Sequence, residues 1–118
     1  MCVSRLALLA LALLCAWAAG QPPRIPQGAA EKRAAEDEAL VIVDAVAFND
    51  FKTAFQHCDG LMARFPDAPH GYMMSVFARS IYVNCYRSKS MRLLILEHTK
   101  RVEETTTRLL KLYPMDRE

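Results

Sequence analysis

The side chains best suited to catalysis or metal binding in this chain are those of its three histidines and four cysteines. His57, Cys58 and Asp59 are consecutive, so on a helix they point about 100° apart and cannot all face one metal ion. Cys58 with any of the three histidines, His57, His70 or His98, would make a thiol nucleophile and its base, but no local motif supports that pairing. The sequence also has no glycine-rich phosphate loop and no nucleophile elbow. We therefore expect no catalytic residue, no metal site and no cofactor.

The first twenty residues have the pattern of a secretory signal peptide. Arg5 precedes an uninterrupted apolar run over residues 6–19, and small residues follow at the end of that run. Cleavage after Ala18 or Gly20 would release an exported protein, either periplasmic or extracellular. A membrane anchor is one alternative, although a span needs roughly 20 apolar residues. A lipoprotein attached through Cys15 is another, but the residue before this cysteine is not small.

Export determines what the remaining cysteines can do. After cleavage the chain keeps only Cys58 and Cys85, and an oxidising compartment could join them in a disulfide. Alternatively, each thiol packs as a small hydrophobe, because both residues lie on apolar stripes of expected helices. The sequence leaves both alternatives open.

The segment 21–30 contains three prolines and has no periodicity, so we expect a flexible linker there. The ordered domain is then expected over residues 31–118. Its first element grows out of the charged run 31–39 into the β-branched residues Val41, Ile42 and Val43. That short run also fits a buried strand, but its continuity with a helix-forming segment favours a helix.

Three further helices follow from apolar spacing. Over residues 51–65 the apolar side chains recur every three or four positions, and Pro66 ends the pattern. Residues 70–87 and 91–113 continue with the same helical spacing. Short connections join antiparallel neighbours, so the predicted fold is all-α, with two antiparallel helical hairpins after the signal peptide.

The two hairpins end in similar sequence motifs, "LMARFP" at Pro66 and "LLKLYP" at Pro114. The two prolines are 48 residues apart. The stretch "NDFKTAFQHCDGLMARFP" resembles the second helix of a tetratricopeptide repeat, with its aromatic residue, its small crossing residue and its terminating proline. The chain is similar to a divergent, long-helix version of this family, as found in exported bacterial proteins. The resemblance implies an α-solenoid in which the following residues pack the repeats together: Phe51, Ala54, Cys58, Leu61, Pro66 and Pro114.

The resemblance also implies a function. Tetratricopeptide repeats present a concave face lined by the first helix of each hairpin, and they bind other proteins or peptides there. The residues expected on that face are Ala45, Phe48, Tyr72, Ser75 and Arg79. We therefore expect a non-catalytic interaction or scaffold module. The alternatives are an accessory or small-ligand-binding helical protein, and a structural end piece of a longer solenoid.

Charge is divided unevenly along the chain. Residues 21–69 hold five basic and eight acidic side chains, whereas residues 70–118 hold nine basic and five acidic ones. A basic surface could meet an acidic partner or an anionic membrane, or it could be the ordinary solvated side of two helices. No aromatic pattern interleaves the charges, so no nucleic acid is expected. The basic residues in question are Arg87, Lys89, Arg92, Lys100, Arg101 and Arg108.

Two hairpins are fewer than such an architecture usually needs. Each repeat buries its apolar side against its neighbours, and at least three repeats are normal for stability. The expected last helix carries more apolar residues than one neighbour can cover. We therefore expect either further repeats beyond Glu118 or self-association.

Overall fold

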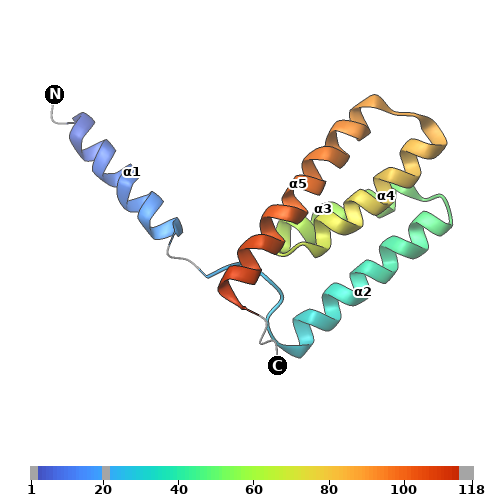
Figure 1. Ribbon diagram of the computed structural model, residues 1–118, viewed down its shortest axis with the longest axis horizontal. Coiled ribbons are helices and arrows are strands. Elements are labelled where there is room, and N and C mark those ends of the chain that lie inside the picture. The colour runs from blue at the N-terminus through green and yellow to red at the C-terminus, as the bar shows by residue number, and fades with distance from the viewer. Residues whose placement is uncertain (1–2, 20–21, 115–118) are drawn as a thin grey trace.

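The structure is a computed structural model that describes residues 3–19 and 22–114. It confirms the all-α prediction, because the described residues form helices joined by short connections and contain no strand. The expected cleavage point at Gly20 and the last residues of the expected domain, 115–118, lie outside the described residues. The helices are α1 (Val3–Ala19), α2 (Gly28–Ala47), α3 (Phe51–Arg64), α4 (His70–Tyr86) and α5 (Lys89–Leu112) (Figure 1).

Local sequence features place these helix ends. The β-branched run at Val41 lies inside α2, which agrees with the helical interpretation. Asn49 takes a positive φ of 59° in the turn after α2, and the Asp50 side chain then accepts a hydrogen bond from the Thr53 amide at 3.2 Å. An aspartate at this position satisfies one of the free amides of the first turn, so it fixes the start of α3. Ser88 caps α5 in the same way, by accepting from the Met91 amide.

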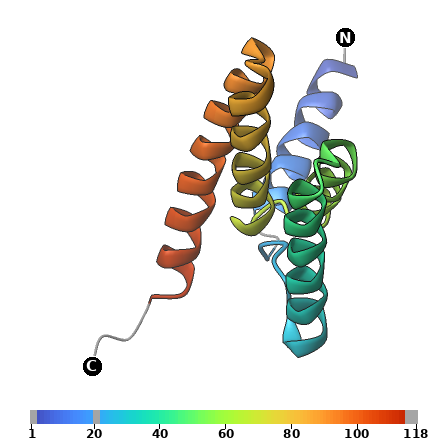
Figure 2. The same cartoon turned by 90° about the vertical axis from the view of Figure 1, so that its right-hand side faces the viewer.

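Helix α4 lies at the centre of the helical body. It contacts α2, α3 and α5, while α2 and α3 contact each other and α5 contacts no helix except α4. Figure 2 shows α5 on one side of α4 and the pair α2 and α3 on the other. Helices α3 and α4 approach closely at Gly71, where an added Cβ would stand 2.8 Å from the Met62 backbone nitrogen. Fully buried Ile42, Cys58 and Leu61 fill the space between these three helices.

Helix α5 is only half covered. Its stripe of Leu94, Ile95, Val102 and Leu109 is partly buried, and Thr105 is its one buried residue. Leu93 and Leu96, on other sides of the helix, are 70% and 68% exposed. An apolar surface on the last described helix agrees with the expectation that one neighbour cannot cover it.

The segment before α2 differs from the expected flexible linker. The Arg24 amide donates to Asp67 Oδ2 at 2.7 Å, and the Asp67 amide donates back to the Arg24 carbonyl at 3.4 Å. Pro26 is buried and Ile25 packs against the core. This segment therefore lies on the helical body, and α2 begins at Gly28, before the expected start at residue 31.

Among the described residues, helix α1 makes no contact with another helix, and it stands apart from the other four (Figure 1). Its side chains from Leu6 to Leu13 are exposed. None of the described helices combines the length and the apolar character that a membrane span requires.

Candidate functional site

An apolar groove of about 380 Å³ opens between α2, α4, the C-terminal part of α5 and the segment before α2. It lies at the end of the body where α2 and α5 spread apart in Figure 2, and residues of the first turns of α4 form its floor. Its volume is within the range of pockets that hold small ligands or single apolar side chains. The groove residues are Ile25, Pro26, Lys32, Ala35, Glu36, Ala39, Ala68, His70, Met73, Met74 and Leu109.

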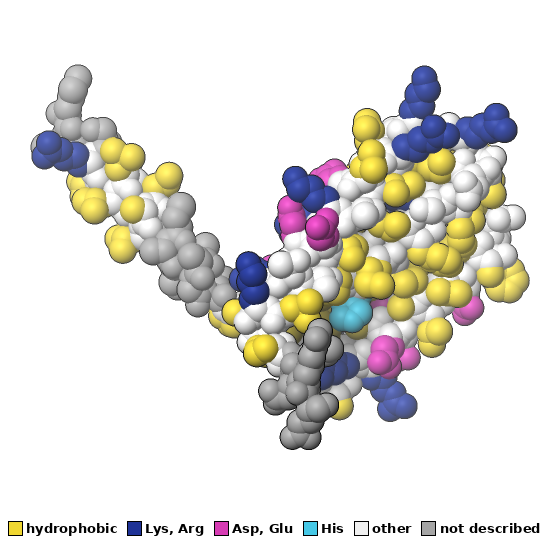
Figure 3. All heavy atoms as spheres, in the orientation of Figure 1, with side chains coloured by type: hydrophobic (Ala, Val, Ile, Leu, Met, Phe, Trp, Pro, Cys, Tyr) yellow, Lys and Arg dark blue, Asp and Glu magenta, His cyan; other side chains and the backbone are white. Residues whose placement is uncertain are grey.

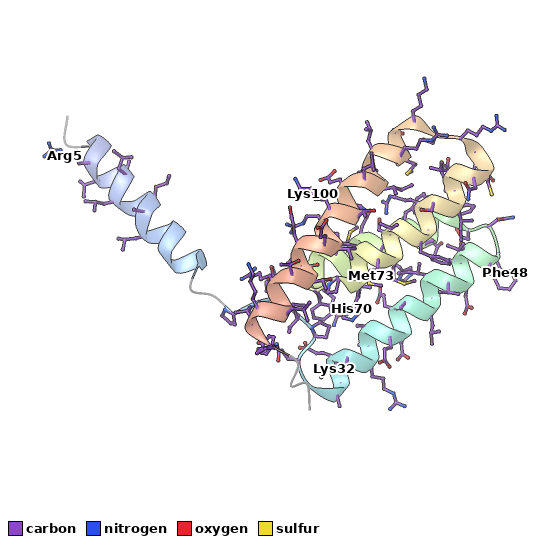
Figure 4. The ribbon with its side chains drawn as sticks, viewed as in Figure 1. Arg5, Lys32, Phe48, His70, Met73 and Lys100 are labelled. Atoms are coloured by element: carbon purple, nitrogen blue, oxygen red, sulfur yellow. The ribbon has the colours of Figure 1, made fainter. Side chains whose placement is uncertain are left out.

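Apolar side chains continue from the groove along two helices. Val43 follows the groove residue Ala39 by four positions on α2, and Phe77 follows Met73 by four on α4, so each pair shares one side of its helix. Val43, Met73 and Phe77 are 41%, 53% and 40% exposed. We call the groove together with Val43 and Phe77 the α2–α4 face. Figure 3 shows hydrophobic side chains gathered over these helices around a histidine, which Figure 4 labels as His70.

Charged groups are confined to the rim of the groove. Lys32 and Glu36 are exposed on successive turns of α2, and His70 is exposed at the first position of α4. Lys32, His70 and Met73 lie on the same side of the body in Figure 4. The α2–α4 face therefore suits an apolar ligand whose polar groups remain at the edge.

Comparisons with protein-family models, with curated proteins and with solved structures find no match for this chain.

The residues expected on the concave face occupy different places. Ala45, Tyr72, Ser75 and Arg79 are buried between helices, so they do not form an open surface. Only Phe48 is exposed, at 84%, in the turn after α2. On α4 the exposed Met73 directly follows the expected Tyr72, and a shift of one residue turns a side chain by about 100° around the helix.

The open positions were hard to find from sequence. Met73 and Phe77 belong to an apolar stripe, and such a stripe normally indicates core. The available signal was that residues 70–86 carry apolar side chains around most of the helix, more than its neighbours cover. That excess predicts an exposed apolar strip but does not say which side of the helix carries it.

The buried polar residues form a network between α4 and α5. Arg79 Nη1 donates to Ser75 Oγ, and Ser75 Oγ lies 2.6 Å from His98 Nδ1. Either atom can be the donor in this contact, because the serine hydroxyl has one proton to donate and two lone pairs, so it can accept from Arg79 and from an Nδ1–H together. Burial, and secondarily the positive charge of Arg79, lowers the pKa of His98. His98 is therefore a neutral packing residue of the α4–α5 interface.

The buried guanidinium of Arg79 has few partners for its charge and its N–H groups. Its Nη2 reaches Asp59 Oδ1 at 3.4 Å, its guanidinium lies 4.7 Å from the centroid of the Phe55 ring, and its buried Nε has no described partner. Tyr72 joins the same side of α4, where its hydroxyl donates to the Pro66 carbonyl at 3.1 Å and accepts from Arg101 at 3.3 Å. These contacts give Tyr72 and Arg79 structural roles.

The expected packing residues divide into two groups. Phe51, Ala54, Cys58 and Leu61 are buried along one side of α3, where they contact α2 and α4 through the core. The two prolines stand at helix ends: Pro66 is partly buried after α3, and Pro114 is exposed after α5.

Both cysteines of the helical body are free thiols. Cys58 is buried, and this burial raises its pKa to about 11. A thiol with a raised pKa is a poor nucleophile, so Cys58 packs as a hydrophobe. Cys85 is exposed, so of the two thiols only Cys58 packs as the second alternative described, and the structure does not join them in the possible disulfide.

Histidine and acidic side chains do not gather into a metal site anywhere in the described ranges. His57 instead pairs with one carboxylate, Glu38 Oε1, at 2.8 Å across α2 and α3. Three of the six basic residues singled out from sequence are paired with acidic side chains. Arg101 and Lys100 pair with Glu104, and Arg108 pairs with Asp67 at 3.0 Å.

Proposed function

We propose that this chain is a non-catalytic interaction module that binds a segment of another protein through the α2–α4 face. The observation that carries the proposal is the groove, because an apolar groove of about 380 Å³ continues into exposed Val43 and Phe77. Contiguous exposed apolar surface with a polar rim is typical of protein interaction sites.

A tetratricopeptide-like arrangement is part of the same proposal. It is supported by the pairing of α2 with α3 and of α4 with α5, and by a proline after the second helix of each pair. In such repeats the first helices line the binding surface, and here α2 and α4 supply most of the groove. The leucine-rich sequence of α1 supports export, which we retain as a proposal.

The test uses two valines on one helix that differ only in direction. Val43 and Val41 are 41% and 42% exposed, and their positions on α2 differ by about 200°. Peptides selected from a random library for binding to the folded protein should bind about tenfold or more weakly to Val43→Asp, because an aspartate opposes apolar contact. Val41→Asp is the matched control and should leave their affinity unchanged.

Equal effects of the two substitutions on the selected peptides would place binding elsewhere and would remove the proposal. Circular dichroism of both variants excludes loss of folding as the cause.

The second candidate function is binding of a small apolar ligand, and the groove volume favours it. Val43 lies beyond the groove residues, so a small ligand held in the groove should be insensitive to Val43→Asp. Such a ligand should instead be lost in Ala39→Phe, whose ring would occupy the groove. A peptide that binds the whole α2–α4 face should lose affinity in both variants.

A further inference from the structure

We propose that the partner segment is an amphipathic α-helix that carries acidic residues at the end nearest the α4–α5 turn. The inference rests on the proposed function, and it names the chemistry of the partner. It follows from the backbone of the α2–α4 face, the spacing of its side chains and the charges beyond it.

The backbone of the face favours a helical partner over an extended one. Helices supply most of the face, and the amide and carbonyl groups of their interiors are paired within each helix. The rest comes from the segments at Ile25, Pro26 and Ala68, and no described segment is a strand whose edge could pair with a peptide. An extended peptide would cover apolar side chains with its own amides and carbonyls unpaired, which is costly. A helix satisfies its own backbone and can present only apolar side chains to the groove.

The side chains of the face have the spacing that a helix needs. Ala39 and Val43 form one row of two residues four positions apart, and Met73 and Phe77 form a second row on the neighbouring helix. Rows at this spacing are the ridges between which the side chains of another helix pack. At the end of the rows marked by Ala39 and Met73, the groove offers space for a large apolar anchor side chain.

Both rows run toward the turn between α4 and α5. The Phe51 and Tyr86 rings are 6.1 Å apart, so the start of α3 and the end of α4 lie at the same end of the body. A helix of about four turns would reach from the groove to this end, because α2 covers the same distance between Lys32 and Ala47.

That end is basic. No acidic residue occurs between Asp67 and Glu97 in the sequence. Arg87, Lys89 and Arg92 are exposed around the turn, and none of them forms an ion pair with another described residue. Figure 3 shows the basic side chains projecting at this end, beyond the hydrophobic ones. At the groove end, by contrast, Lys32 has Glu36 beside it. Charge complementarity therefore places the acidic end of the partner at the turn.

The experiment compares three synthetic peptides of about four helical turns. The first has leucines along one helical side and three glutamates at one end. The second carries three lysines in place of the glutamates, and the third has the first peptide's composition except for prolines that prevent a helix. We expect the first to bind and to gain helical circular dichroism on binding, the second to bind about fivefold more weakly at low salt, and the third not to bind.

Charge reversal on the protein provides the reciprocal test. In Lys89→Glu/Arg92→Glu the preference for the glutamate peptide over the lysine peptide should disappear or reverse. Acidic residues are favourable in the first turn of a helix, so the double variant should keep α5 folded. Lys100→Glu/Lys111→Glu makes the same charge change farther along α5 and should retain the preference.

Several outcomes would overturn the proposal while leaving the proposed function intact. They are stronger binding by the proline peptide than by the helical one, equal binding of the glutamate and lysine peptides, and failure of all three peptides at a face that library-selected peptides use. Binding of the glutamate peptide that is insensitive to Val43→Asp would place it on the basic turn alone, and this result would also overturn the helix proposal.

Discussion

The protonation of His98 should affect the stability of the fold. It contacts Ser75 across the α4–α5 interface, and the groups that bear on its charge are Arg79 from α4, Asp59 from α3 and Glu97 on its own helix. Burial and Arg79 lower its pKa in the folded state, so protons bind the unfolded chain more tightly. Its contribution to stability is therefore complete above the ordinary histidine pKa of about 6.5 and is lost as the pH falls through the lowered pKa.

We predict that the urea midpoint decreases as the pH is lowered from about 7 to 5, and that His98→Gln removes much of this decrease, since glutamine does not titrate. Urea titrations of both proteins across this range make the measurement. An unchanged pH dependence in His98→Gln would show that other groups cause it.

The two cysteines should differ sharply in reactivity. Cys58 is buried with a pKa of about 11, whereas Cys85 is exposed at the end of α4. A thiol reagent at pH 8 should modify Cys85 in the folded protein within minutes and modify Cys58 only after unfolding, because the thiolate is the reacting form. Mass mapping of the two peptides checks this. Rapid modification of Cys58 in the folded state would contradict its place in the core.

At the scale of the helices, two glycines give opposite predictions for the same substitution. A Cβ on Gly71 would stand 2.8 Å from the Met62 backbone, whereas on Gly60 it would touch only Glu38 Oε1, at 3.9 Å. Gly71→Ala should destabilise the protein by about 1–3 kcal/mol through overpacking between α3 and α4. Gly60→Ala, inside α3, should stabilise it by about 0.5–1 kcal/mol through helix propensity. Denaturant midpoints that move in the same direction would contradict the close α3–α4 contact.

The helices themselves were largely predictable from sequence. Apolar spacing and the proline at residue 66 predicted α3 closely, because a regular stripe with a stop signal has few other solutions. The early start of α2 was not predictable, since Gly28 is a poor helix former. Helix formation there is accompanied by contacts that only the folded body supplies, namely the buried Pro26 and the hydrogen bonds of Arg24 with Asp67.

The binding residues were predicted less well, for a geometric reason. A tetratricopeptide resemblance aligns helices to within a residue or so, but one residue moves a side chain by about 100°. Tyr72 and Ser75 were expected to be open and are buried, while the adjacent Met73 is half exposed. Which side of α4 stays open depends on where α5 packs, and that is a tertiary contact with no local sequence signal.

Across the whole molecule, stability should decrease toward α5. This helix packs against α4 alone and has only Thr105 buried, whereas α3 contacts two helices and contributes four buried residues. We predict faster hydrogen exchange in residues 89–112 than in 51–64, measured by mass spectrometry under native conditions. Equal protection of both helices would indicate that a second copy or another partner covers α5 in solution.

The docked segment before α2 has a practical consequence for ligand discovery. Ile25 and Pro26 line the groove, so a test peptide joined to the chain just before Pro22 would begin within a few residues of its binding site. A short tether of this kind gives an effective concentration in the millimolar range. Peptides that bind too weakly to be detected in free form would then occupy the groove when they are fused to the chain. A rise in the melting temperature of a fusion protein would show that its peptide fits the groove.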